Sequence, residues 1–242
     1  VPIVIRSDDS PEKTVRKIAA FDLDGTLIKT RSGLSFARSP HDWQWFNGSV
    51  SSQLAKLHTE NYLLVIFTNQ GGVVAEEKQK KPSKSYTNFV QRVEAVMESL
   101  KKEIEGIKKA NGEGTKRDIE KSKSDCDIEK LEKGTKCEDE KNDINDNQPH
   151  NIDIYVYASP KRPASSKTAS PQFKHDDMRK PGIGMWQELI RSLEETGFSV
   201  DIEKSFFVGD AAGRANDFLD SDRKFAEAIG ITFKEPEEIF TE

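Results

Sequence analysis

Short apolar runs alternate with amphipathic segments along the chain. Four runs predict buried strands, because each is four to seven residues long and mostly apolar: Ile18–Leu23, Tyr62–Phe67, Ile152–Ala158 and Ser205–Val208. Between them, apolar residues recur at helical spacing over Ser49–Glu60, Tyr86–Leu100 and Gly184–Thr196. Strands that alternate with helices predict an α/β fold, with a mostly parallel sheet and helices on both of its faces.

One long stretch of the chain is charged throughout. Between Glu98 and Asn147 there are 15 acidic and 12 basic side chains, and no aromatic residue occurs from residue 90 to 154. Such a composition cannot bury enough apolar surface to offset the entropy of ordering the chain. We therefore predict a charged, disordered insertion at about 103–150, as a solvated loop or a loose helix. It interrupts a domain at 18–242, which follows a polar leader at 1–17.

The balance of charge and the cysteine count limit the possible classes of protein. With 37 Lys and Arg against 42 Asp and Glu, the net charge is −5, so any nucleic-acid contact needs a local basic patch. Cys126 and Cys137 lack metal-site spacing and are too few for a disulfide framework. No apolar run approaches the roughly 20 residues of a membrane span, and no signal-peptide segment opens the chain. We expect a soluble, intracellular protein.

Polar side chains follow three of the predicted strands. Asp22 and Asp24 stand at the end of the first strand, and the other two groups are Thr68-Asn69-Gln70 and Gly209-Asp210. In parallel sheets, ligands bind at the carboxyl ends of the strands. Two acids after a strand are by themselves often only a turn or a helix cap. Here the alternate spacing puts both carboxylates on one side of the chain, and Gly25 permits a tight turn beside them. We therefore predict a reactive site at this edge.

The first of these groups carries a resemblance. The string FDLDGTL at 21–27 is similar to the first motif of the haloacid-dehalogenase-like phosphohydrolases, whose sheet is Rossmann-like. The other three motifs of that superfamily have counterparts in order: Thr68 after the second strand, Lys180 before a helix and Asp210 after a later strand. The resemblance implies a Rossmann-like, haloacid-dehalogenase-like α/β fold for the chain.

Longer strings narrow the resemblance to one family. Over roughly 17–100 and 152–240 the chain resembles the polynucleotide kinase 3′-phosphatase family. The strings that carry this resemblance are KTRSG (29–33), SPHDW (39–43), VIFTNQGG (65–72), RKPGIGMW (179–186), FFVGDAAGR (206–214) and DRKFA (222–226). No G-x-x-x-x-G-K-[ST] phosphate-binding loop occurs in the sequence. We therefore expect a phosphatase-only member without 5′-kinase activity.

The resemblance implies an enzyme that removes the 3′-phosphate from DNA ends at strand breaks, in DNA repair. A phosphomonoester repels nucleophiles through its own charge, so a cation must neutralise it. Mg²⁺ takes oxygen ligands, here Asp22, Asp210 and the backbone carbonyl of Asp24. Asp22 would form an aspartyl-phosphate, while Asp24 would protonate the leaving oxygen and then activate water. Thr68 would bind a phosphoryl oxygen, and Lys180 would balance the negative charge of the phosphate and of Asp22.

Residues near the motifs are candidates for contact with the substrate. We predict substrate binding by Asn69, Gln70, Arg31 and Arg179. A second set either follows a phosphate backbone or is ordinary surface charge: Lys29, Arg38 and the basic loop at 161–174. Three aromatic residues either stack on an unpaired base or pack in the core: Trp43, Trp45 and Phe46. No sequence-reading motif is present, so we expect DNA contact without base specificity.

One position departs from the superfamily pattern. The superfamily often has a second acid four residues after the position of Asp210, and Arg214 stands there instead. We take Asp217 as the candidate outer-shell acid of the metal site, with Asp222 as a second candidate. A surface position or a helix cap is the alternative for each.

Other functional classes remain open at this point. A small-molecule phosphatase of the same superfamily, of the sugar- or histidinol-phosphate type, is the first alternative, although no Cys/His cluster suits a zinc loop. The second alternative is a DNA-end scaffold with a vestigial site, which the intact set of motif residues disfavours. The resemblance implies a nuclear location, and we expect a monomer with no membrane association.

Overall fold

A single parallel sheet forms the centre of the structure, a computed structural model that describes residues 14–74, 82–122, 154–162, 171–217 and 219–241. The strand order is β5-β4-β1-β7-β8, and β6 pairs with the start of β1. All of these pairs are parallel. The strands are β1 (Thr14–Phe21), β4 (Tyr62–Val74), β5 (Ile154–Lys161), β6 (Phe198–Val200), β7 (Phe206–Val208) and β8 (Thr232–Lys234). The predicted α/β architecture is confirmed.

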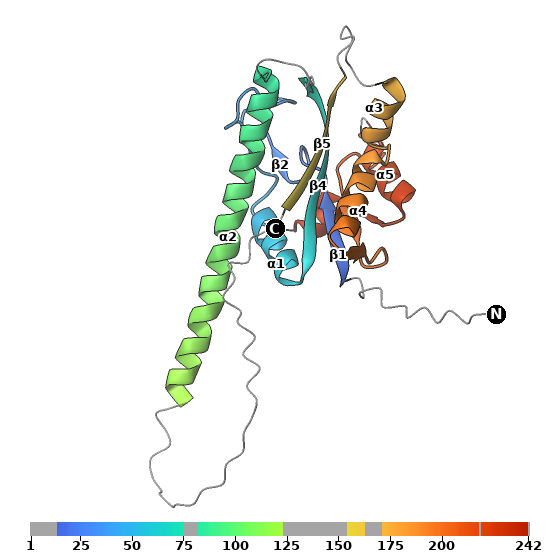
Figure 1. The fold of residues 1–242 in the computed structure, drawn as a ribbon. Coiled ribbons are helices and arrows are strands. Elements are labelled where there is room, and N and C mark those ends of the chain that lie inside the picture. Colours follow the sequence, from blue (N-terminus) through green and yellow to red (C-terminus); the bar gives the residue numbers. More distant parts are fainter. Residues whose placement is uncertain (1–13, 75–81, 123–153, 163–170, 218, 242) are drawn as a thin grey trace, which may run out of the picture.

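Helices cover both faces of this sheet (Figure 1). On one side lie α1 (Val50–Thr59) and α2 (Lys84–Ser122), and on the other lie α3 (Gln172–Met178), α4 (Gly184–Glu195) and α5 (Ser221–Ile229). The short α6 (Pro236–Ile239) ends beside Phe240, which belongs to the same apolar cluster as α1 and α2. None of the helices within the described residues is both long and apolar enough to cross a bilayer.

The central strands supply apolar side chains to both faces. In β1, Ala19 and Phe21 join the apolar cluster under α1 and α2, whereas Ile18 and Ala20 join the cluster under α4 and α5. Both clusters are buried, and successive residues of a strand point to opposite faces. This explains why the predicted strands are apolar at consecutive positions rather than at alternate ones.

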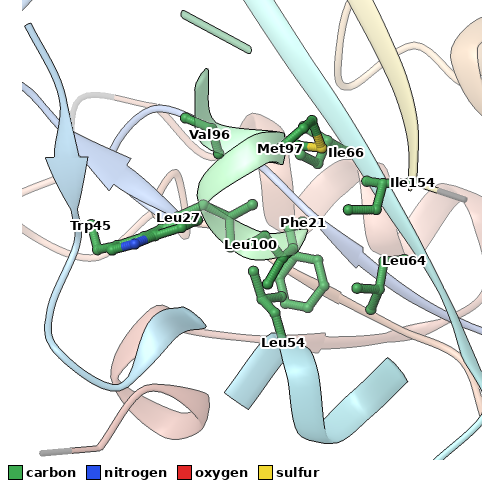
Figure 2. Close-up of a pocket in the computed structure, with 10 residues that line it drawn as sticks. All are labelled: Phe21, Leu27, Trp45, Leu54, Leu64, Ile66, Val96, Met97, Leu100 and Ile154. Carbon is green, nitrogen blue, oxygen red and sulfur yellow. The ribbon is translucent and has the colours of Figure 1, made fainter. Parts of the chain in front are cut away.

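The packing of α2 extends further than its sequence pattern suggests. Figure 2 shows Val96, Met97 and Leu100 of α2 beside Phe21 and the β4 side chains, around a cavity of only about 10 Å³. The helix was predicted to end at Leu100 but continues to Ser122, and Ile104, one turn further on, is fully buried. The apolar spacing therefore continues into the start of the predicted insertion. The remainder of that insertion, from residue 123, lies outside the described residues.

We expect Ile104→Ala to lower the free energy of unfolding by about 2–4 kcal/mol, because it leaves a cavity beneath α2. Glu105→Ala, an exposed change in the same helical turn, is the matched control and should change it by less than about 0.5 kcal/mol. Urea denaturation of both variants measures the difference. Equal stability of the two would contradict the packing of α2 at this depth.

Several small elements have no clear sequence signal. These are the two-stranded antiparallel sheet of β2 (Ile28–Lys29) and β3 (Gln44–Trp45), together with β6, β8, α3 and α6. β1 also begins at Thr14, before the predicted start of the domain, because residues 14–16 pair with the unpredicted β6. The rest of the predicted leader, residues 1–13, lies outside the described residues. Trp43, Trp45 and Phe46 pack against the core, which is the second of the two roles considered for them.

Candidate active site

Four charged side chains meet at the carboxyl edge of the sheet. Asp22 follows β1 and Asp210 follows the adjacent β7, and the Asp22 amide donates to the Val208 carbonyl at 2.8 Å. Lys180 precedes α4, and Asp222 lies in the first turn of α5. The parallel order of β1 and β7 therefore brings together residues that are 188 positions apart in sequence.

The cluster carries more negative than positive charge. One carboxylate oxygen from each of Asp22, Asp210 and Asp222 lies within 4.8 Å of the others, and Lys180 Nζ lies 2.7 Å from both Asp22 Oδ1 and Asp222 Oδ1. Burial raises the pKa of Asp22 well above its ordinary value, and the other two acids raise it further against the opposing effect of Lys180. Burial, followed by repulsion from Asp222, raises the pKa of Asp210 to about 6. Three acids facing one ammonium create a strong demand for a further cation.

Lys180 is buried and held at both its side chain and its backbone. Burial disfavours its charge, but the attraction of Asp22 and Asp222 outweighs this, and the pKa of Lys180 rises above its ordinary value. The Asn69 side chain donates to the Lys180 carbonyl at 2.9 Å and accepts from its amide at 3.0 Å. Lys180 is therefore a fixed cation that stays protonated in this site.

Two glycines allow the acids to approach the backbone. Gly25 has φ +91°, and a Cβ at this position would lie 2.5 Å from a carboxylate oxygen of Asp210. A Cβ on Gly209 would lie 2.5 Å from the Cβ of Asp222. Both contacts are far closer than van der Waals distance, so these positions require glycine. The sequence motifs at 22–26 and 209–210 thus have a steric cause.

A polar network joins Asp24 to Thr68 and Gln70, which lie within β4 because this strand continues past its predicted end at Phe67. Gln70 Nε2 donates to Asp24 Oδ2 at 2.7 Å and to Thr68 Oγ1 at 2.8 Å. Arg92 of α2 approaches the same two side chains, with its Nη2 3.5 Å from Gln70 Oε1 and 3.7 Å from Asp24 Oδ2. Gln70, Thr68 and Arg92 are buried, whereas the Asp24 side chain is 48% exposed. Asp24 is therefore fixed in place and still open to a ligand.

A cleft of about 490 Å³ adjoins Asp24. Its walls come from the loop at 35–37, the end of β4 and the first turns of α2, and the lining includes Phe36, Gly71, Gly72, Asn88 and Arg92. A substrate bound in this cleft would reach Asp24 directly.

The comparisons with known proteins identify the family. Residues 17–240 match the family described as polynucleotide kinase 3 phosphatase. The chain belongs to this polynucleotide kinase 3′-phosphatase family. Its fold resembles a crystal structure named as a had-like phosphatase, from Mesorhizobium loti, with a TM-score of 0.51 and 17% identity over 90% of this chain and 70% of that one. Both the predicted family and the predicted fold class are confirmed.

The chain spans most of one relative but less than half of two others. The polynucleotide 3′-phosphatase of Saccharomyces cerevisiae is 30% identical, over 92% of this chain and 87% of that protein. A bifunctional polynucleotide phosphatase/kinase of Schizosaccharomyces pombe is 32% identical over 94% of the chain, which spans 38% of that relative. The Arabidopsis thaliana polynucleotide 3′-phosphatase is 29% identical over 98% of the chain, which spans 26% of it.

The residues predicted for catalysis in this family member fall into two connected groups. Asp22, Lys180 and Asp210 share the charged cluster, and Asp24 and Thr68 share the network through Gln70. Two residues predicted to bind substrate, Asn69 and Gln70, line the cleft beside Asp24. They also have structural contacts, because Asn69 holds the backbone of Lys180 and Gln70 joins Asp24 to Thr68.

The two predicted arginines lie in different places. Arg179 is half-buried, and its guanidinium Nη2 would lie 3.5 Å from a Cβ on Gly71, at the edge of the cleft. Arg31 is exposed and lines a separate, open hollow of about 410 Å³ with Arg38 and His41. Arg179 therefore lies nearer to the candidate active site than Arg31 does.

Asp222, and not Asp217, lies in the acidic cluster. Asp217 accepts hydrogen bonds from the Ala212 and Arg214 amides at 3.1 and 3.0 Å, and it pairs with the Arg214 side chain at 2.9 Å. It therefore shapes the loop after β7. The DRKFA string at 222–226 was the only sequence signal for Asp222, and none existed for Arg92, whose helix was recognisable only by its apolar face.

Proposed function

We propose that this protein is a Mg²⁺-dependent polynucleotide 3′-phosphatase that removes the 3′-phosphate from DNA ends at strand breaks. One observation carries the proposal: Asp22 is buried beside Lys180 and the acids Asp210 and Asp222. The adjoining cleft is lined by Asp24, which is open to a ligand. The match to the Saccharomyces cerevisiae polynucleotide 3′-phosphatase over most of both chains supports the choice of substrate. The proposal includes a monomeric enzyme in nuclear DNA repair, without base specificity.

The donor set of the cluster fits a magnesium ion. Asp22 and Asp210 offer carboxylate oxygens in a site with excess negative charge, and such hard oxygen donors suit Mg²⁺. Both oxygens of Asp222 already accept hydrogen bonds, from Lys180 at 2.7 Å and from the Ala211 amide at 3.1 Å. Asp22, Asp210 and the backbone carbonyl of Asp24 would hold the ion, with Asp222 behind them. When bound, Mg²⁺ neutralises charge on the phosphate that is transferred.

Asp22 and Asp24 divide the chemistry between them. Asp22 attacks phosphorus while the bond from phosphorus to the 3′-oxygen breaks, and Asp24 gives its proton to that oxygen. Asp24 then takes a proton from the water that attacks the aspartyl-phosphate, which releases phosphate and restores Asp22. The 2.7 Å bond from Gln70 fixes one oxygen of Asp24, and the other oxygen serves as the acid and base.

Thr68 and Lys180 complete the phosphate site. The Thr68 hydroxyl accepts from Gln70 at 2.8 Å, so its own hydrogen is available to donate to a phosphoryl oxygen. Lys180 is fixed 2.7 Å from Asp22, where its ammonium lies beside the charge that develops on the phosphoryl group. Both groups are buried and held before the substrate arrives, and such pre-organised donors stabilise a transition state most effectively.

A competition experiment distinguishes this substrate class from small phosphate esters. Hydrolysis of a sugar phosphate or of p-nitrophenyl phosphate is followed while single-stranded or nicked DNA with a 3′-phosphate is added. We expect the DNA to inhibit at concentrations at which DNA with a 3′-hydroxyl does not. Efficient turnover of a sugar phosphate that DNA leaves unaffected would favour a small-molecule phosphatase instead.

A further inference from the structure

Arg92 is a buried guanidinium with few partners. Its side chain is 9% exposed, and its Nε has no hydrogen-bond partner within the described part of the chain. The contacts of Nη2, to Gln70 at 3.5 Å and to Asp24 at 3.7 Å, are long for charge-assisted bonds. A guanidinium has five N–H donors, and leaving them unpaired in a buried site is costly. Arg92 therefore has donors to spare for a ligand.

The position of Arg92 limits what that ligand can be. Arg92 lines the cleft beside Asp24, and among the described residues that line this cleft it is the only cation and Asp24 the only anion. The cleft is open beside Gly72, which also lines it, because a Cβ on Gly72 would meet no atom within 4 Å. The cleft thus places the guanidinium of Arg92, which has unpaired donors, near Asp24, the acid that faces the leaving group. An anionic part of the leaving group is the ligand that fits.

We propose that Arg92 binds the second phosphate of the substrate, namely the phosphodiester on the 5′ side of the terminal nucleotide. This inference rests on the proposed function, in which Asp24 protonates the 3′-oxygen and the departing nucleotide occupies the adjoining cleft. The next anion along the strand is that phosphodiester, and a guanidinium binds phosphate through two parallel N–H bonds. Arg92 would then select strands over mononucleotides without reading a base.

Two short substrates with the same reacting group test the role of Arg92. Thymidine 3′-monophosphate lacks the second phosphate, and the dinucleotide TpTp, with its terminal 3′-phosphate, contains it. We expect kcat/KM of the wild-type enzyme to be about tenfold or more higher for the dinucleotide. Arg92→Gln should reduce this ratio to near one, and Arg92→Lys should retain part of it. The ratio is the readout, because Arg92 also contacts Gln70 and Asp24 and its loss slows both substrates.

A neutral linkage supplies the matched test on the substrate. Replacing the internal phosphodiester of the dinucleotide by a methylphosphonate should lower wild-type kcat/KM about as much as Arg92→Gln does, and should have no further effect in that variant. Lys102→Gln, an exposed change on the same helix, should keep the full ratio. If Arg92→Gln fails to fold by circular dichroism, the effect of methylphosphonate on the wild type decides alone.

The outcomes separate this inference from the proposed function. A wild-type enzyme that cleaves long 3′-phosphorylated DNA, but shows no methylphosphonate effect, would overturn the role of Arg92 alone. An unchanged ratio in Arg92→Gln, with both substrates slowed equally, would make Arg92 only a positioning residue for Gln70 and Asp24. Absence of phosphate release from every 3′-phosphorylated nucleotide would overturn the inference and the proposed function together.

Discussion

Asp22→Asn should lower kcat for phosphate release by about a thousandfold or more, because an amide cannot form the acyl-phosphate. The variant should still fold, since the change removes one of three negative charges from a cluster that holds a single ammonium. It should also still bind 3′-phosphorylated ends, because Asp24, Thr68 and Lys180 remain. Single-turnover release of phosphate from a labelled DNA end measures the loss, and fluorescence anisotropy measures the binding.

A control variant and a trapping experiment sharpen this result. Asp201→Asn changes an acid at the opposite end of β1, where the Asp201 amide bonds to the Arg16 carbonyl, and should leave kcat within about twofold of the wild type. Acid quenching of the wild-type enzyme during turnover should recover label on the protein, and Asp22→Asn should show none. Turnover by Asp22→Asn near the wild-type rate would rule out a covalent role for Asp22.

Removal of Mg²⁺ should have the second-largest effect. We expect activity to be lost in EDTA and restored by Mg²⁺, because the acidic cluster needs a cation before it can receive a phosphate. Binding should also stabilise the fold without substrate, by about 2.7 kcal/mol at a Mg²⁺ concentration one hundred times the dissociation constant. Thermal denaturation with and without Mg²⁺ measures this second effect independently of catalysis.

The variant Asp210→Asn shows whether Mg²⁺ stabilises the protein by binding at the acidic cluster or through a general effect of added salt. The variant loses one of the acids that crowd the cluster, so without metal it should be at least as stable as the wild type. It should gain little from Mg²⁺ and should have lost most of its activity. If Mg²⁺ raised the melting temperature of Asp210→Asn as much as that of the wild type, the metal would have to bind elsewhere.

The sheet and most of the site could be predicted from the sequence, because they depend on short runs of neighbouring residues. The parts of β1, β4 and β7 that are buried on both faces are apolar at consecutive positions, so they are recognisable as short runs. Parallel strands end at one edge, so polar residues directly after them must come together. Asp22 and Asp210 follow from these two facts, and the family strings placed Lys180 beside them.

The features that sequence reasoning missed or left open depend on tertiary contacts. Asp222 comes from a helix turn that packs against Gly209, and nothing in its spacing distinguishes it from Asp217. Arg92 lies on α2, where its burial depends on how the helix lies over β4. The short strands β6 and β8 have three residues each and derive their order from their pairing with β1 and β7. These features result from tertiary packing, which the spacing of apolar residues along the sequence does not predict.

The central claim is tested most directly by phosphate release, in the presence of Mg²⁺, from an oligonucleotide with a 3′-phosphate. The comparisons are the same oligonucleotide with a 5′-phosphate and a panel of sugar phosphates. The site and the family predict rapid release from the 3′-phosphorylated strand and little from the others. Release from sugar phosphates alone would leave the fold and the aspartyl-phosphate chemistry in place but would contradict a function on DNA ends.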